Sequence, residues 1–241
     1  MKKVLFTIAL VLSAAIGSYA QNKDYNRFYA SFNMGSYSLK GMGDTRDSEI
    51  TEATAGLNSF GVIGVNMGYA HAISLSKTTP LFLELGLEAN YSAGSEKVPG
   101  TTADINVKML NLQVPLNFTY RIPVTEKFAI APFVGANFKV NIIGNASVSV
   151  NDYNSEAISF FNEDDMSAMS SITSGRTETA NRFQIGMNAG VNFIIANKFS
   201  IGYRFQPDFM NYFGYDIKLK SYDGGVKLTS TNHYISLGLV F

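Results

Sequence analysis

The sequence has no cysteine, no tryptophan and only two histidines among its 241 residues. Without cysteine there is no disulfide, so the stability of the protein must come from the fold itself. Charged residues make up only 16% of the chain, and 19 basic residues balance 19 acidic ones. No stretch forms the basic stripe that contacts to nucleic acid phosphates require, which excludes nucleic acid as a partner.

Long apolar runs are also missing after the first 20 residues, so no later segment is long enough to cross a bilayer as a helix. The N-terminus has two lysines, an apolar run over residues 4–12 and the triplet Ser18-Tyr19-Ala20. This order is typical of a signal peptide over residues 1–20, cleaved between Ala20 and Gln21. The alternative, a single membrane anchor, needs roughly 18–20 apolar residues, more than this run offers.

Cleavage leaves a mature chain of 221 residues, in which the loss of Lys2 and Lys3 leaves 17 basic residues against 19 acidic ones. This length suits one domain of ordinary size. We expect residues 21–27 to form a short periplasmic segment and residues 28–241 to form the folded domain.

Strict alternation of apolar and polar residues is the strongest signal in the mature chain. In residues 81–91 leucine, alanine and tyrosine hold every odd position, and in residues 110–122 apolar residues hold every even one. Because side chains alternate across a strand, each segment has one apolar and one polar face. Six further segments repeat the pattern more loosely, namely 28–39, 60–72, 128–142, 182–195, 199–212 and 233–241.

About eight such strands predict an all-β fold, an antiparallel up-and-down transmembrane β-barrel with a polar packed interior. A lipocalin-like soluble barrel has the same alternation with its apolar face turned inward. Glycines on the polar face favour the membrane barrel, because small residues make room for polar side chains in a narrow lumen. They are Gly35, Gly64, Gly68, Gly86, Gly135, Gly186, Gly190, Gly202 and Gly238.

Two further patterns favour the membrane barrel. Aromatic residues on the apolar face gather near the strand ends, as in the girdles at membrane interfaces. Long connections (40–59, 93–107, 143–181 and 213–232) alternate with short ones (73–80, 123–127 and 196–198), as external loops alternate with periplasmic turns in such barrels. Outer-membrane lipid is therefore an expected partner.

The last strand ends on an aromatic carboxyl-terminal residue. It is similar to the terminal signal that the barrel insertion machinery reads, and the residues expected to carry this signal are Tyr234, Leu237, Leu239 and Phe241. The alternative is that Phe241 only anchors the last strand at the membrane interface.

Several short motifs resemble the Bacteroidetes outer-membrane β-barrel family that includes the PorT-like proteins. They are residues 110–116 (LNLQVPL), 131–136 (APFVGA), 185–190 (IGMNAG) and 201–205 (IGYRF), together with the Ala20-Gln21 junction. The resemblance implies an outer-membrane barrel, and for a few PorT-like members a link to a secretion system for surface proteins. Pro115 and Pro132 fit the family pattern, and we expect local bulges at both because proline removes a ladder hydrogen bond.

The polar face carries charged residues that predict an ion-paired plug inside the barrel, namely Glu84, Glu88, Arg121, Lys139 and Arg204. Buried charges in a narrow lumen must pair, and we expect Glu84 and Glu88 to pair with Arg121 or a neighbouring cation. Acid–base catalysis or an ion path is the alternative.

Enzymatic activity is not expected. A nucleophile needs an oriented base beside it, and His71 and His233 both fall on the lipid-facing parity at opposite rims. The connection 143–181 is acidic but lacks the ligand spacing of an EF-hand, so neither a metal nor a cofactor is expected. The same connection carries four large apolar residues, Phe160, Phe161, Met166 and Met169. They form either an exposed hydrophobic patch for a partner or a cover over the barrel mouth.

The sequence thus favours a non-enzymatic outer-membrane barrel with a structural or interaction role through its external loops, and connection 143–181 is the candidate contact for an envelope or extracellular protein. The alternatives are a PorT-like accessory component of secretion and, third, an outer-membrane enzyme.

Overall fold

The computed structural model describes residues 23–40, 59–97, 102–151, 153–165, 180–210, 214–215 and 226–241. Eight long strands dominate this part of the chain: β1 (Tyr25–Lys40), β2 (Ser59–Ser74), β3 (Leu81–Lys97), β4 (Ala103–Tyr120), β6 (Phe128–Val150), β9 (Phe183–Ile195), β10 (Phe199–Pro207) and β12 (Val226–Val240). Four short strands accompany them: β5 (Ile122–Thr125), β7 (Tyr153–Asn154), β8 (Ile158–Ser159) and β11 (Gly214–Tyr215).

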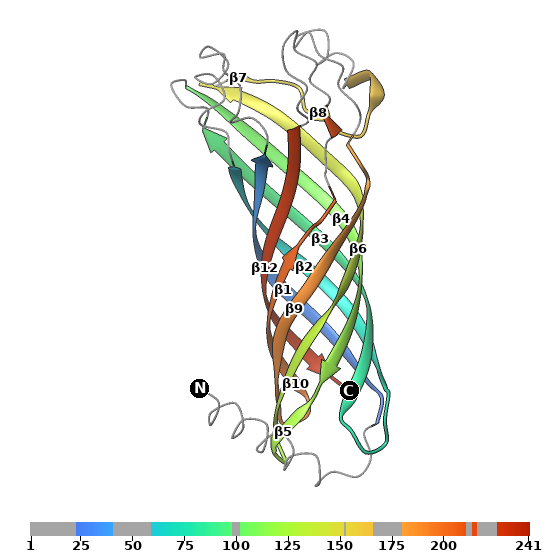
Figure 1. Ribbon diagram of the computed structural model, residues 1–241. Coiled ribbons are helices and arrows are strands. Elements are labelled where there is room, and N and C mark those ends of the chain that lie inside the picture. The colour runs from blue at the N-terminus through green and yellow to red at the C-terminus, as the bar shows by residue number, and fades with distance from the viewer. Residues whose placement is uncertain are drawn as a thin grey trace, which may run out of the picture.

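The long strands form a closed antiparallel barrel. Each pairs with its neighbour in the order β1-β2-β3-β4-β6-β9-β10-β12, and β12 pairs back onto β1. The strands are tilted along an elongated barrel (Figure 1). No helix in the described residues is long and apolar enough to cross a membrane. The predicted fold class, an antiparallel barrel of eight main strands, is confirmed.

The apolar faces of the strands point outward. On β3, Leu87 is 59% exposed while Glu88 beside it is 1% exposed, and the same contrast recurs along the other long strands. A barrel with apolar residues outside and polar residues inside fits a lipid environment around a polar lumen. This arrangement rules out the soluble barrel with an apolar cavity.

The two ends of the barrel differ in their connections. The tight connections 75–80, 126–127 and 196–198 lie at the end where the chain terminates (Figure 1). Outer-membrane barrels place their short turns and both termini on the periplasmic side. The opposite end, where β7 and β8 lie, is therefore the external end.

The strands at the external end are longer than the alternation predicts. β3 and β4 run through most of the expected loop 93–107 and leave only residues 98–102 between them, and β6 continues to Val150 within the expected connection 143–181. β12 likewise starts early at the external end, at Val226 inside the expected loop 213–232. At the periplasmic end β1 starts at Tyr25, inside the expected segment 21–27. The barrel wall therefore continues beyond the predicted spans.

Neither proline produces a bulge, so that prediction is wrong. Pro115 pairs with Asn137 and Pro132 pairs with Val191 in unshifted registers. Opposite Pro115, the β3–β4 ladder lacks the pairs at Gly86 and Leu87 and then resumes in the same register. One missing proline N–H accounts for this gap, because a single ladder hydrogen bond is lost without an extra residue.

The register shift between β4 and β6 instead falls at Leu110 and Asn111, which pair with Ile143 and Asn141 and leave Ile142 as the extra residue. Such a bulge exchanges the faces of the strand beyond it. Ile142 and Ile143 both point outward, and the buried Gly144 follows. As a result the side chain of Ala146 points inward and packs against the apolar cluster of the barrel mouth. Without the bulge it would continue the outward apolar series of Val140 and Ile142.

Candidate functional site

Among the described residues, three ion pairs occupy the interior of the barrel. Arg27 pairs with Glu84 at 2.6 Å, Arg204 with Glu88 at 2.5 Å and Lys139 with Asp208 at 2.5 Å. All six side chains are almost completely buried. The three cations balance the three anions, so this set of buried charges is neutral, as buried ions must be to avoid a large desolvation cost.

Glu88 has contacts with three other side chains. Arg204 donates to both carboxylate oxygens, Nη1 to Oε1 at 2.5 Å and Nη2 to Oε2 at 2.8 Å. Tyr29 donates a further hydrogen bond to Oε1, and Asn66 Nδ2 donates to Oε2 at 2.8 Å. The Arg204 guanidinium also lies 4.0 Å from the centre of the Tyr234 ring. Such two-point, charge-assisted bonds hold both partners in one geometry.

The contacts join opposite walls of the barrel. In the ring of eight long strands, β3 and β10 are four strands apart in either direction, and so are β4 and β12. Glu88 of β3 meets Arg204 of β10, and Gln113 Nε2 of β4 donates to Tyr234 Oη of β12 at 3.3 Å. At these levels side chains bridge the full width of the lumen.

Amide side chains fill the same level around Gln113. Its Oε1 accepts hydrogen bonds from Asn137 at 3.0 Å and from Gln206 at 3.1 Å, and its Nε2 donates to Asn111 at 2.7 Å. Gln113, Asn137 and Gln206 are fully buried. This layer comes from β4, β6 and β10, which ties three walls together.

Apolar clusters close both ends of this polar network. At the periplasmic end the buried cluster is Tyr25, Ala72, Phe82, Ala129, Ala131, Ile194 and Val240. At the external end it is Tyr37, Val62, Val107, Met109 and Ala180. Phe160 and Phe161 pack against the external cluster, and the Arg182 guanidinium lies 4.7 Å from the Phe161 ring. These two phenylalanines therefore cover the barrel mouth from inside, whereas Met166 and Met169 lie outside the described residues.

The structure brings Glu84, Glu88, Lys139 and Arg204 into the lumen, but Arg121 lies elsewhere. It follows the last residue of β4 at the periplasmic rim, where Nη2 donates to Asn197 Oδ1 at 2.7 Å. Of the two expected partners for Glu84 and Glu88, the neighbouring cations Arg27 and Arg204 form the ion pairs and Arg121 does not. The Arg121 guanidinium instead lies 5.7 Å from the centre of the Tyr25 ring.

Two members of the network, Arg27 and Asp208, were missed by the sequence reasoning. Arg27 precedes the expected start of β1 by one residue, and it donates to Glu84 and, through Nη1, to Asn192 at 3.0 Å. Asp208 shares the parity of Arg204, a signal that was present in the sequence. It accepts hydrogen bonds from Lys139 and Ser230.

The two histidines lie on the outer surface. His71 Nδ1 is 2.8 Å from Asn26 Oδ1 near the periplasmic rim, and His233 Nδ1 is 2.8 Å from Tyr203 Oη on the β10–β12 wall. Among the described residues neither has a serine hydroxyl as partner, and no group of three or more His, Asp or Glu side chains is placed to hold a metal ion.

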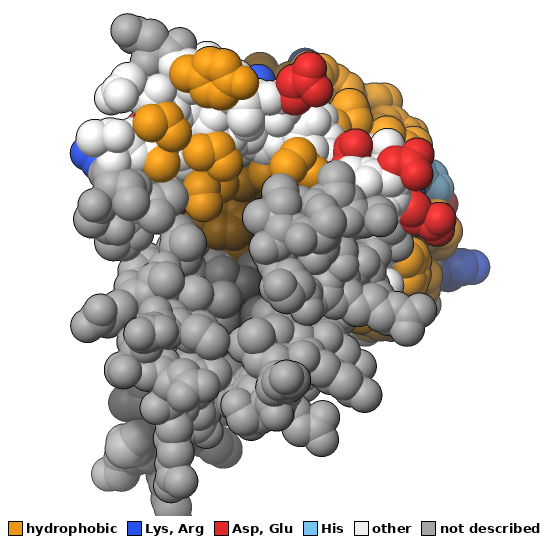
Figure 2. All heavy atoms as spheres, turned by 90° about the horizontal axis from the view of Figure 1, so that it is seen from above, with side chains coloured by type: hydrophobic (Ala, Val, Ile, Leu, Met, Phe, Trp, Pro, Cys, Tyr) orange, Lys and Arg blue, Asp and Glu red, His pale blue; other side chains and the backbone are white. Residues whose placement is uncertain are grey.

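The outer surface changes character toward the external end. On β4 the outward residues pass from Leu112 and Leu110 to Lys108 and Asn106, while the inward ones pass from Gln113 and Asn111 to the buried Met109 and Val107. On β1 the outward Met34 gives way to Ser36 and Ser38. The wall is thus apolar outside and polar inside below this boundary, and reversed above it. Figure 2 looks onto this end and shows hydrophobic side chains gathered on its described part.

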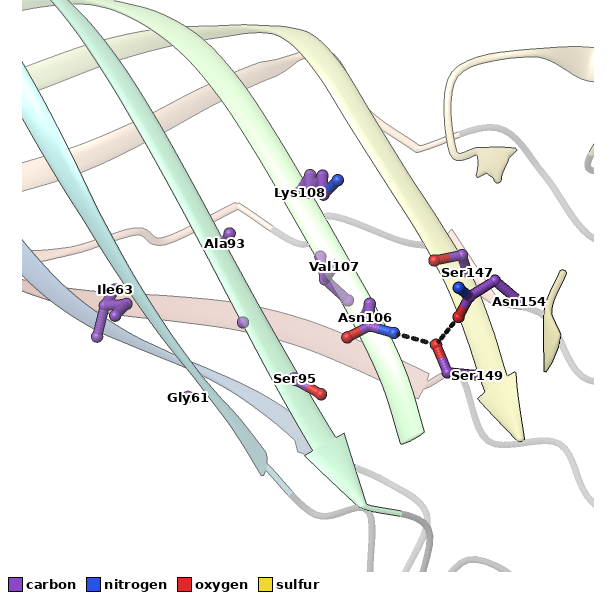
Figure 3. A pocket seen from close by; sticks show the side chains of 11 residues that line it. Gly61, Ile63, Ala93, Ser95, Asn106, Val107, Lys108, Ser147, Ser149 and Asn154 are labelled. Carbon is purple, nitrogen blue, oxygen red and sulfur yellow. Dashed lines mark hydrogen bonds between the residues drawn. The ribbon is translucent and has the colours of Figure 1, made fainter. Parts of the chain in front are cut away.

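A groove of about 770 Å³ lies on the outer face just above the boundary. Its lining includes Ile63, Ser95, Asn106, Lys108 and Asn154, contributed by β2, β3, β4 and β7. Asn106 Nδ2 donates to Ser149 Oγ at 2.8 Å, and Ser149 Oγ donates to Asn154 Oδ1 at 2.6 Å, as Figure 3 shows.

The residues expected to carry the terminal insertion signal fall on both faces of β12. Tyr234 is buried in the lumen, whereas Leu237, Leu239 and Phe241 are exposed on the outer face. The junction between Ala20 and Gln21 lies outside the described residues.

Known structures with a related arrangement have little sequence in common with this chain. One is Ail, the attachment invasion locus protein of Yersinia pestis, in a structure of its complex with a heparin analogue. Its sequence is 12% identical to this chain, with 91% of this chain and 99% of that chain covered and a TM-score of 0.41. OprG of Pseudomonas aeruginosa is 11% identical, with 94% and 98% covered and a TM-score of 0.41. Neisserial surface protein A is 12% identical, with 88% and 96% covered and a TM-score of 0.42.

A search of curated proteins found no match. The family model described as outer membrane protein beta-barrel domain matches residues 6–241, nearly the whole chain. With the closed ring of strands and the outward apolar faces, this match assigns the chain to the outer membrane. The chain belongs to the outer membrane protein β-barrel domain family.

Proposed function

We propose that this protein is a closed, non-enzymatic outer-membrane barrel that acts by contact through its external end. The observation that carries the proposal is the pair of contacts between opposite walls, Glu88 to Arg204 and Gln113 to Tyr234. An aqueous path along the axis would have to break both.

The surroundings of these contacts also argue against an ion path. The buried charges are neutral as a set, so they offer no net attraction to a permeating ion. Apolar side chains lie above and below them, and an ion that crossed either cluster would lose its hydration without compensation.

The external end offers the surface for contact. The wall continues beyond the lipid-facing belt with polar residues on its outer side, and Phe160 and Phe161 turn inward against the external cluster. A partner would therefore meet a polar wall and the connections above it, with the exposed Tyr153 of β7 beside them.

Conductance in planar bilayers tests the closed lumen. The processed full-length protein should give no channel steps above the membrane leak, while the double variant Glu88→Ala with Arg204→Ala, which lacks the contact across the lumen, should give small steps. Stable open pores in the unmodified protein would overturn the proposal.

Exchange of the external connection tests the contact role. Phe160, Phe161 and Ala180 belong to the closure of the mouth, so the exchange should begin at Asn162 and end at Thr179, with a glycine-serine linker in place of the native residues. Capture of a partner from gently solubilised envelopes should be lost in this variant and kept in the unmodified protein. A defect in surface-protein export on gene deletion would instead favour the secretion role that the PorT-like resemblance implies, and hydrolysis of a lipid or peptide that the exchange abolishes would favour an enzyme.

A further inference from the structure

We propose that the outer groove above the lipid-facing belt binds the phosphorylated sugar headgroup of a lipid in the external leaflet. This inference rests on the proposed function, since it assigns a ligand class to the external outer wall.

The groove begins where the lipid-facing residues end. Ile63 forms its lower edge and is 61% exposed, and Lys108 is the next outward residue above Leu110 on β4. Two residues of a strand tilted by about 40° rise roughly 5 Å. The headgroup layer on each side of a bilayer is about 5–8 Å deep, so Lys108 lies at headgroup height and Asn106 lies one step further out.

The chemistry of the lining suits a phosphorylated sugar. Lys108 is exposed, and among the described residues no carboxylate forms an ion pair with it. An ammonium group is a compact donor for one phosphate. The amide and hydroxyl groups of Ser95, Asn106, Ser147 and Asn154 provide donors and acceptors for sugar hydroxyls, and the bonds through Ser149 hold Asn106 and Asn154 in position.

The floor of the groove is open to a ligand. A Cβ built on Gly61 would meet no atom within 4 Å, in contrast to Gly94, whose Cβ would lie 2.1 Å from the Gly61 carbonyl oxygen on the opposite, inward side. Below the polar lining, Ile63 offers an apolar contact for the first carbons of an acyl chain. A lipid that lies against the belt would therefore extend its headgroup into the groove without a turn.

The first experiment measures binding to the folded mature protein in detergent by calorimetry. The probe is a water-soluble, deacylated bisphosphorylated glucosamine disaccharide, compared with the same disaccharide without phosphate and with inorganic phosphate. We expect the bisphosphorylated probe to bind most tightly, Lys108→Gln to weaken it roughly fivefold, and Gly61→Leu to abolish binding by filling the groove. Lys77→Gln, on a periplasmic turn, is the matched control and should bind normally.

The second experiment uses the lipid itself. In phosphatidylcholine vesicles, addition of the intact phosphorylated glycolipid should raise the urea midpoint of the unmodified protein and of Lys77→Gln, and should raise that of Lys108→Gln and Gly61→Leu less. Each variant is first shown to be folded by the shift of its unboiled band on gels.

The assignment of the groove to a phosphorylated sugar would be overturned by any of three results. These are equal binding by all folded variants, equal affinity for inorganic phosphate and for the bisphosphorylated disaccharide, and no binding at all. None of these results would disturb the proposed function, which fails only if the unmodified protein conducts or if its external end can be exchanged without loss of contact.

Discussion

Glu88 and Arg204, which are 116 positions apart in the chain, form a two-point ion pair across the full width of the barrel. Glu88 is 1% exposed and Arg204 is 8% exposed. Each therefore depends on the other for compensation of its charge in a region with little access to water. The pair also fixes the separation of two opposite walls, which ties the stability of the barrel to the closure of its lumen.

Removal of one partner should cost far more than removal of both. Glu88→Leu and Arg204→Met each leave an uncompensated buried charge, and each should lower the free energy of unfolding by about 3–5 kcal/mol. The double variant leaves no buried charge and should lose less than either single variant. Urea unfolding in phosphatidylcholine vesicles measures all three.

Lys77→Gln provides the control for this series, because Lys77 is exposed on a periplasmic turn. Its effect should stay within about 0.5 kcal/mol. If the costs of the two single variants simply added in the double variant, Glu88 and Arg204 would not act as a pair.

Gly86 and Pro115 should be coupled through a steric contact instead of a charge. A Cβ on Gly86 would lie 2.8 Å from Pro115 Cγ, so Gly86→Ala should destabilise the barrel by about 1–3 kcal/mol. Pro115→Ala removes the ring and restores an N–H toward β3, and in that background Gly86→Ala should cost much less. Gly61→Ala, whose Cβ meets no neighbour, is the matched control. The same unfolding assay would reject the steric account if the two substitutions proved additive.

The strand count and the outward apolar faces could be predicted from the sequence because each lipid-facing segment keeps one parity for most of its length. The external extensions could not. On β4 the apolar parity changes between Met109 and Leu110, and a rule that searches for one unbroken parity ends the strand there. On β6 the apolar parity continues, but the bulge at Ile142 turns the later residues inward, which no pattern of apolar residues records.

The interior site could be predicted only as a set of polar residues of one parity. Which carboxylate meets which cation depends on the stagger between strands on opposite walls, and a single sequence contains no measure of it. Arg121 shows the limit of the parity rule: its parity is that of Gln113, but it lies past the end of its strand. Arg27 was not predicted for a similar reason, at the start of a strand instead of its end. β1 begins at Tyr25, three residues before its apolar pattern, so Arg27 fell outside the expected strand.

Deletion of Ile142 tests the function of the bulge. Loss of this residue would restore a regular register and turn Ala146 outward, so the external part of β6 should lose the contact of Ala146 with the mouth cluster. Hydrogen exchange of the amides in residues 144–150 should become faster, while the lower part of β6 stays protected. Ile142→Ala keeps the residue count and should leave the exchange pattern unchanged. Unaltered protection in the deletion variant would show that the bulge does not set the faces.

One continuous wall of the barrel faces lipid below the boundary and water above it. The chain has no cysteine, so single cysteines at Leu112, Leu110, Lys108 and Asn106 can each carry a spin label without background. Electron paramagnetic resonance in lipid vesicles then compares the access of oxygen, which concentrates in lipid, with that of a water-soluble nickel complex. High oxygen access is expected at Leu112 and Leu110, with a reversal in favour of nickel by Asn106. A constant ratio along these four outward positions would contradict it.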